Sequence, residues 1–245
     1  MPLMNPRALA VIGIAAALGG SAALVLAGSG YRWGWWALPD AFQLLRIGAF
    51  VAGGGAILSL LSAVWTWRRG KRALAALAFV LGVSGSAAVT VPLLQLRTAK
   101  SVPRIHDITT DTANPPRFET LLPARLGSPN GAAYGGDAIA AQQHAAYPDL
   151  QPIRLDTSSA EAFARAHDAA RAMDWTIAAE DPVQGVIEAT DRTFWFGFMD
   201  DIVVRVQPEG TGSVVDVRSA SRVGLSDVGT NARRIRAYRQ RLLGR

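Results

Sequence analysis

Three long apolar runs without a charged residue constrain this chain more than any other feature. They cover residues 8–27, 47–67 and 73–94. Each has the roughly 20 residues that a helix needs to cross about 30 Å of hydrocarbon at about 1.5 Å per residue. A segment surrounded by lipid must satisfy its backbone hydrogen bonds internally, so these runs are expected to be helices. The sequence therefore predicts a three-span membrane anchor over residues 1–96.

The distribution of charge predicts the orientation of this anchor. Residues 1–96 hold seven basic residues and one acidic residue, whereas the rest of the chain holds eighteen of each, so the net charge of +6 lies in the anchor. Four cations fill the five-residue loop 68–72, and such loops stay in the cytoplasm. We expect a cytoplasmic N-terminus and a periplasmic C-terminal domain in a bacterial inner membrane. The balanced charge of that domain argues against nucleic acid as a partner.

Two features of the anchor leave alternatives open. The first run is either a membrane span or a signal peptide cleaved near Ala27, and both leave the C-terminal domain outside. Small residues in the three runs either pack the spans on one another or dock a larger membrane complex. These small residues are Gly13, Ala17, Gly20, Gly53–Gly55, Gly82 and Ser86. The runs contain no acid or histidine, which argues against a proton relay.

Residues 97–104 are predicted to be a linker, and residues 105–245 a soluble domain. Ser158 and Glu161 have capping-box spacing and predict a helix to about Met173. Brief helices are expected at 118–122 and, with Asp137 as N-cap, at 137–146. Alternating apolar residues and turn signals predict two hairpins. A last helix is expected from about Asp227 or Thr230 to Leu243. The predicted strands are 175–179, 185–193, 201–207 and 213–222. The fold class is α+β, with two helices on one face of an antiparallel sheet of about four strands.

Two blocks of this domain resemble a known family. One is RIHDITTDTANPPRF (104–118), and the other is WFGFMDDIVVRV (195–206), continued by DVRSASRVGLSDVGTNARRIRAY (216–238). Together they resemble the bacterial, membrane-anchored family of domain of unknown function 1499, over roughly residues 104–243. The resemblance implies a cell-envelope protein whose role is unknown, and it supplies no catalytic residues.

Polar residues gather near the end of the last strand and the start of the last helix. Free N–H groups at a helix start favour an anion, and neighbouring arginines would complete a phosphate or carboxylate site. The alternative is a structural network in which these arginines pair with Asp191, Asp200, Asp201 and Asp216. The ligand-binding candidates here are Asp200, Asp201, Arg218, Ser221, Arg222, Ser226, Asp227, Asn231 and Arg234.

An aromatic cluster precedes the third strand. Phe194, Trp195, Phe196 and Phe198 surround Gly197. They either fill the core between sheet and helix or form an exposed patch for a lipid, a partner protein or the membrane surface. Trp195 and Phe196 are the ligand-binding candidates of this cluster.

The sequence was also searched for residues that could hold a metal or perform catalysis. His106 and Asp107, with Asp111, have too few neighbours of ligand-like spacing to predict a metal, so the first two remain ligand-binding candidates and no metal or cofactor is expected. Cysteine is absent, which excludes thiolate chemistry.

We expect a protein that binds an envelope lipid, a small anion or a partner protein. One alternative is an enzyme with Asp200 or Asp201 as base and Arg218 or Arg222 as anion clamps. Another is an accessory subunit of a membrane complex.

Overall fold

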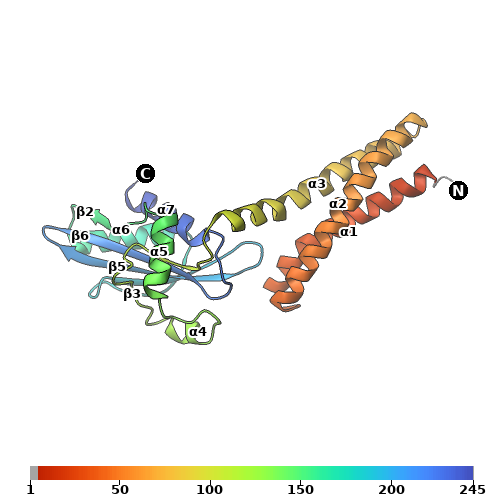
Figure 1. The fold of residues 1–245 in the computed structure, drawn as a ribbon. Coiled ribbons are helices and arrows are strands. Elements are labelled where there is room, and N and C mark those ends of the chain that lie inside the picture. Colours follow the sequence, from red (N-terminus) through yellow and green to blue (C-terminus); the bar gives the residue numbers. More distant parts are fainter. Residues whose placement is uncertain (1–4, 245) are drawn as a thin grey trace. The chain divides into compact units, whose positions relative to one another are not determined.

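The computed structural model describes residues 5–244 and divides into two compact units (Figure 1). The first unit contains residues 5–97 together with Phe194–Gly197. The second contains Thr98–Thr193 and the chain from Phe198 onward. The four residues Phe194–Gly197, named the aromatic loop below, therefore group with the N-terminal helices although they lie far from them in the sequence.

The first unit is built from three helices. Each is long and apolar enough to cross a membrane, which confirms the expected spans as helices of this kind. Asn5 caps the first helix by accepting a hydrogen bond from the N–H of Arg7 at 3.0 Å. The helices are α1 (Pro6–Arg32), α2 (Leu38–Arg68) and α3 (Arg72–Ser101).

Helices α1 and α2 approach each other at glycines. A Cβ added at Gly20 would lie 2.2 Å from the backbone nitrogen of Ala52, and one at Gly55 would lie 2.3 Å from the nitrogen of Ala17. At Gly19 and Gly54 an added Cβ would meet nothing within 4 Å. Glycine is therefore required at the crossing itself, where it allows backbone-to-backbone packing in lipid.

The second unit contains one antiparallel sheet. The strand order is β1-β6-β5-β4-β3, and β2 also pairs with β6. The two predicted hairpins are confirmed as β3–β4 and β5–β6. The two short strands were not predicted, because three residues are too few to show an alternating pattern. The strands are β1 (Asp107–Thr109), β2 (Ile153–Leu155), β3 (Thr176–Asp181), β4 (Val186–Arg192), β5 (Met199–Glu209) and β6 (Gly212–Ser221).

Two helices, α6 (Ser159–Ala172) and α7 (Thr230–Leu242), cover one face of this sheet, as predicted (Figure 1). The Ser158 hydroxyl accepts a hydrogen bond from the N–H of Glu161 at 3.3 Å, which begins α6 where the capping box places it. Aliphatic side chains of the sheet pack against the two helices in the main core. The Tyr238 hydroxyl donates to the carbonyl of Ala166 at 2.9 Å and ties α7 to α6.

The other face is covered by residues 110–135, named the cover segment below, which includes α4 (Leu122–Leu126). A small core forms there from Phe118, Leu121, Val203 and Ala220. The brief helix expected at 118–122 begins later, because the Glu188 carboxylate accepts hydrogen bonds from the N–H groups of residues 119–121 at 2.8–2.9 Å. Helix α5 (Gly136–Ala146) follows. The predicted N-cap Asp137 is wrong, since Gly135 occupies that position and no side chain caps α5.

Candidate functional site

Asp201 of β5 lies at the centre of a charged cluster beneath the cover segment. It is fully buried, and both of its carboxylate oxygens accept hydrogen bonds. Arg222 donates from Nε at 2.9 Å and from Nη2 at 2.8 Å. Arg125 donates from Nη1 at 3.0 Å, and the Thr190 hydroxyl donates at 2.8 Å. The lone pairs of this carboxylate are thus committed to residues of the protein itself.

Arg218 of β6 fixes the cover segment to the sheet. Its guanidinium is buried and forms a two-point contact with Asp107, from Nε at 3.0 Å and from Nη2 at 2.7 Å. It also donates to the carbonyls of Pro116 at 3.0 Å and Ala132 at 2.9 Å. The ring of Phe118 lies 4.8 Å from the guanidinium carbon. One arginine therefore holds β1 and two separate points of the cover segment.

Arg205 of β5 makes a third contact of this kind. Its Nη2 donates to Asp111 at 2.9 Å and to Asp216 at 2.8 Å. The Thr110 hydroxyl donates to Asp216 at 3.2 Å. The first residues of the cover segment are consequently joined to the middle of the sheet by charged hydrogen bonds.

A second charged cluster lies on the opposite face, at the end of the sheet that contacts α7. Arg234 donates to Asp191 at 2.8 Å and to Asp200 at 2.7 Å. It also donates to the Ser219 hydroxyl at 3.0 Å and to the side-chain oxygen of Asn231. Because β4 and β5 place Asp191 and Asp200 in register, one guanidinium compensates two neighbouring carboxylates.

Asn231 extends this cluster toward β1 and β6. Its amide nitrogen donates to the carbonyl of His106 at 2.9 Å and to the Ser221 hydroxyl at 3.1 Å. The side chain of His106 has a buried Nδ1 with no hydrogen-bond partner in the part of the chain that the structure describes. His106 therefore joins the network through its main chain.

Asp227 occupies the start of α7. Its Oδ1 accepts from the N–H of Gly229 at 2.8 Å, and its Oδ2 accepts from the N–H of Asn231 at 2.7 Å. Burial raises the pKa of the Asp227 carboxyl. The Ser226 hydroxyl accepts from the N–H of Val228 at 3.2 Å. These N–H groups, which were candidates for binding an external anion, are bound by the protein's own side chains.

The polar candidate residues thus divide between two faces of the sheet. Asp107, Asp201, Arg218 and Arg222 lie under the cover segment, whereas Asp200, Ser221, Asn231 and Arg234 lie against α7. Successive residues of β5 and β6 point to opposite faces, so the arginines cannot converge on one ligand. The arginines form buried ion pairs, in which aspartate carboxylates accept most of their hydrogen bonds. No group of three or more potential ligands is placed to hold a metal ion among residues 5–244.

The aromatic candidates lie in the first unit. The Trp195 indole N–H donates to the carbonyl of Val25 at 3.1 Å. The ring of Phe196 lies 6.2 Å from the ring of Tyr31 and 5.6 Å from that of Phe42, measured between centroids. These two aromatic residues therefore pack on α1 and α2 and do not fill the core between sheet and helices.

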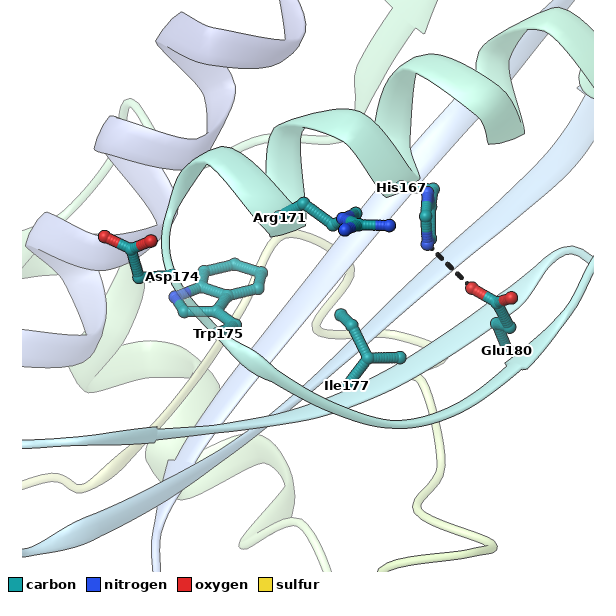
Figure 2. A pocket seen from close by; sticks show the side chains of 6 residues that line it. All are labelled: His167, Arg171, Asp174, Trp175, Ile177 and Glu180. Atoms are coloured by element: carbon teal, nitrogen blue, oxygen red, sulfur yellow. Dashed lines mark ion pairs between the residues drawn. The ribbon is translucent and has the colours of Figure 1, made fainter.

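An open groove of about 540 Å³ lies between α6 and β3 (Figure 2). Figure 2 shows His167 and Arg171 projecting from α6 above Ile177 and Glu180 of β3, with the Trp175 ring at one end. His167 Nε2 lies 2.7 Å from a carboxylate oxygen of Glu180. The guanidinium of Arg171 has no hydrogen-bond or ion-pair partner within residues 5–244.

Trp175 and β3 give this groove a fixed wall and an open side. The Trp175 ring is buried and stacks on Tyr238 of α7, with centroids 5.1 Å apart and planes 13° apart. Strand β3 is the end strand of the sheet and pairs only with β4. The sequence patterns did not predict this site. Its signal was present in the four-residue spacing of His167 and Arg171, which places both on one helical face.

Comparison with known proteins adds a family but no activity. Among curated proteins, no sequence matches this chain. A family described as a protein of unknown function (DUF1499) matches residues 107–242, which is more than half of the chain and includes both charged clusters and the groove. The protein belongs to the DUF1499 family.

Proposed function

We propose that this protein is an inner-membrane-anchored binding protein whose second unit lies in the periplasm and takes an extended segment of a partner protein. The observation that carries this proposal is the groove between α6 and the unpaired side of β3. The anionic-ligand and enzyme alternatives rest on arginines and aspartates that are bound to one another, so neither has comparable support.

The open side of β3 is suited to a polypeptide. Outside its ladder with β4, no main-chain group of β3 has a hydrogen-bond partner in the described chain. A row of alternating N–H and C=O groups is matched most completely by another extended backbone. Main-chain pairing with β3 would supply affinity, and the groove beside it would receive side chains.

The charges of the groove select the partner. Arg171, which has no partner among the described residues, is a cation at the end of the groove near Trp175, and Glu180 is an anion at the other end. A segment with an acidic side chain near Arg171 and an apolar side chain over Ile177 fits this pattern. A register shift in β3 between Ile177 and Ala179 and the acids that end the strand protect the edge against indiscriminate pairing.

The binding test uses the full chain in lipid nanodiscs and a displayed library of random twelve-residue peptides. Selected peptides should bind with micromolar affinity and should weaken at least tenfold when Arg171 is changed to Glu. Amide hydrogen exchange should slow in Thr176–Asp181 on binding, because strand addition protects those N–H groups. The matched control is Arg154→Glu, which reverses the charge of an exposed arginine that lies outside the groove. Binding without protection of β3 would exclude strand addition.

Orientation is tested separately with single cysteines, since the natural chain has none. Val183 is 97% exposed in the turn between β3 and β4, and Arg69 lies in the basic loop between α2 and α3. In intact cells with a permeable outer membrane, an impermeant maleimide should label Val183→Cys and leave Arg69→Cys unlabelled. The reverse labelling pattern would place the second unit in the cytoplasm and would contradict the proposed periplasmic location.

A further inference from the structure

The aromatic loop packs on α1 at a site that is called its seat below. A Cβ added at Gly28 would lie 2.5 Å from the Trp195 ring and 2.9 Å from the Phe196 ring, so both rings need glycine at that position. The Trp195 N–H donates to Val25, one turn earlier in α1. Arg32 Nη1 donates to the carbonyl of Phe194 at 2.5 Å. Contacts at three successive turns therefore fix the loop along the end of α1.

This part of α1 is where the apolar span ends. The apolar run stops at Ala27, and Arg32 is the first charged residue after it. Trp33 and Trp35 follow in the turn to α2 and are 59% and 60% exposed. Exposed tryptophans at the end of an apolar span are typical of the layer of lipid headgroups, where their rings are most stable. The aromatic loop lies at the same level of the helix as these residues.

Phe194 is the most exposed phenylalanine in the described chain, at 90%. It carries its ring outward while its own carbonyl is held by Arg32. An apolar ring beside a guanidinium suits the bilayer interface, where lipid acyl chains meet the phosphates of the headgroups. The ring can enter the acyl-chain region while the cation stays among the phosphates. Water offers no comparable partner for such a ring.

We propose that the aromatic loop is a lipid-contacting element, in which Phe194 inserts into the interfacial layer of the bilayer and Arg32 faces the phospholipid phosphates. The occupant of this surface is the membrane itself. The inference is independent of the groove and requires only that the three helices span a bilayer. It assigns a lipid interface to a loop that lies in the sequence between two strands of the sheet.

The test measures the depth of residue 194 in the full chain. Phe194→Cys is labelled with an environment-sensitive fluorophore and reconstituted in vesicles of phosphatidylcholine and phosphatidylglycerol at three to one. Emission should shift to the blue, and lipids brominated near the glycerol should quench it at least twice as strongly as aqueous iodide does. Val183→Cys, at a fully exposed turn, is the matched control and should respond to iodide only.

A second variant tests the seat. Gly28→Leu should displace the two rings and move the probe at residue 194 into water, so that quenching by iodide rises to the value of the Val183 control. Gly19→Leu, at a position with free space around it, should leave the probe unchanged. An iodide-accessible probe in the Phe194→Cys chain, or one that Gly28→Leu does not move, would overturn the proposal.

Discussion

The interiors of the two units are packed with different kinds of residue. In the first, small residues form the contact between α1 and α2, and the large apolar side chains point outward. In the second, apolar side chains fill the core on one face, and arginines and carboxylates are buried on both. Lipid removes the advantage of burying an apolar side chain, so close backbone approach must stabilise the helices. A charged group that leaves water for the interior of the second unit loses its hydration, so it is stable there only when it has a partner.

The largest effect is expected from breaking one buried pair. Arg218→Met removes the cation opposite Asp107 and the two donors that hold the cover segment. An uncompensated buried carboxylate costs about 3–5 kcal/mol, so unfolding of the second unit by urea should begin at a much lower concentration. Measured by tryptophan fluorescence in detergent micelles, the loss should exceed that of any single surface change.

A double variant sharpens this result. Replacing both partners, as in Asp107→Leu with Arg218→Met, removes the unpaired charge and should recover part of the lost free energy of unfolding. Arg154→Met is the control, because the Arg154–Glu209 pair is exposed, with side chains 67% and 45% accessible. A loss below about 1 kcal/mol for Arg218→Met would mean that the network does not stabilise the fold.

An intermediate effect is expected in the first unit. Gly20→Leu forces a side chain into the backbone of Ala52 and should separate α1 from α2, at a cost of about 1–3 kcal/mol or more. Titration of the micelles with sodium dodecyl sulfate, followed by circular dichroism, reports this loss. Gly19→Leu adds the same side chain where nothing lies within 4 Å. Equal behaviour of the two variants would contradict packing through glycine.

The smallest effect is expected at the surface pair of Asp149 with Arg236. Hydrogen bonds from Arg236 lower the pKa of Asp149 below its ordinary value of 3.8. A lowered pKa in the folded state stabilises the protein above pH 3.8, and this contribution is lost as the pH falls through the folded value. Both side chains are more than a third exposed, so Asp149→Asn should cost at most about 1 kcal/mol near neutral pH.

That difference should vanish in acid. Chemical denaturation of the natural chain and of Asp149→Asn at several pH values measures it. A difference that grows on acidification would show that the sign of the pKa shift is wrong.

The sequence predicts local structure well where one pattern decides it. Ser158 and Glu161 define the start of α6, and the alternation in β6 separates Ser219 and Ser221 from Arg218. These features depend on residues close together in the chain, so periodicity and capping reveal them. The α+β class follows from the same signals.

Partners across the sheet could not be predicted in this way. Arg218 and Arg234 were predicted to lie in one cluster, whereas the sheet separates them onto two faces. Neither the role of Glu188, whose carboxylate holds the cover segment, nor the groove beside β3 was predicted. Such sites depend on strand order and on which loop covers which face, and a single sequence carries no periodic signal for either.

The long-range ion pairs also set an order of events during synthesis. Arg125 and Asp201 are 76 positions apart, and Asp107 and Arg218 are 111 apart. Asp107 and Arg125 leave the ribosome well before their partners have been synthesised, so water hydrates them until the pairs can form. Pairing over such separations is slow, because a long loop must close before any contact stabilises it. The second unit therefore completes its fold only after β6 has emerged, when the membrane helices have long been made.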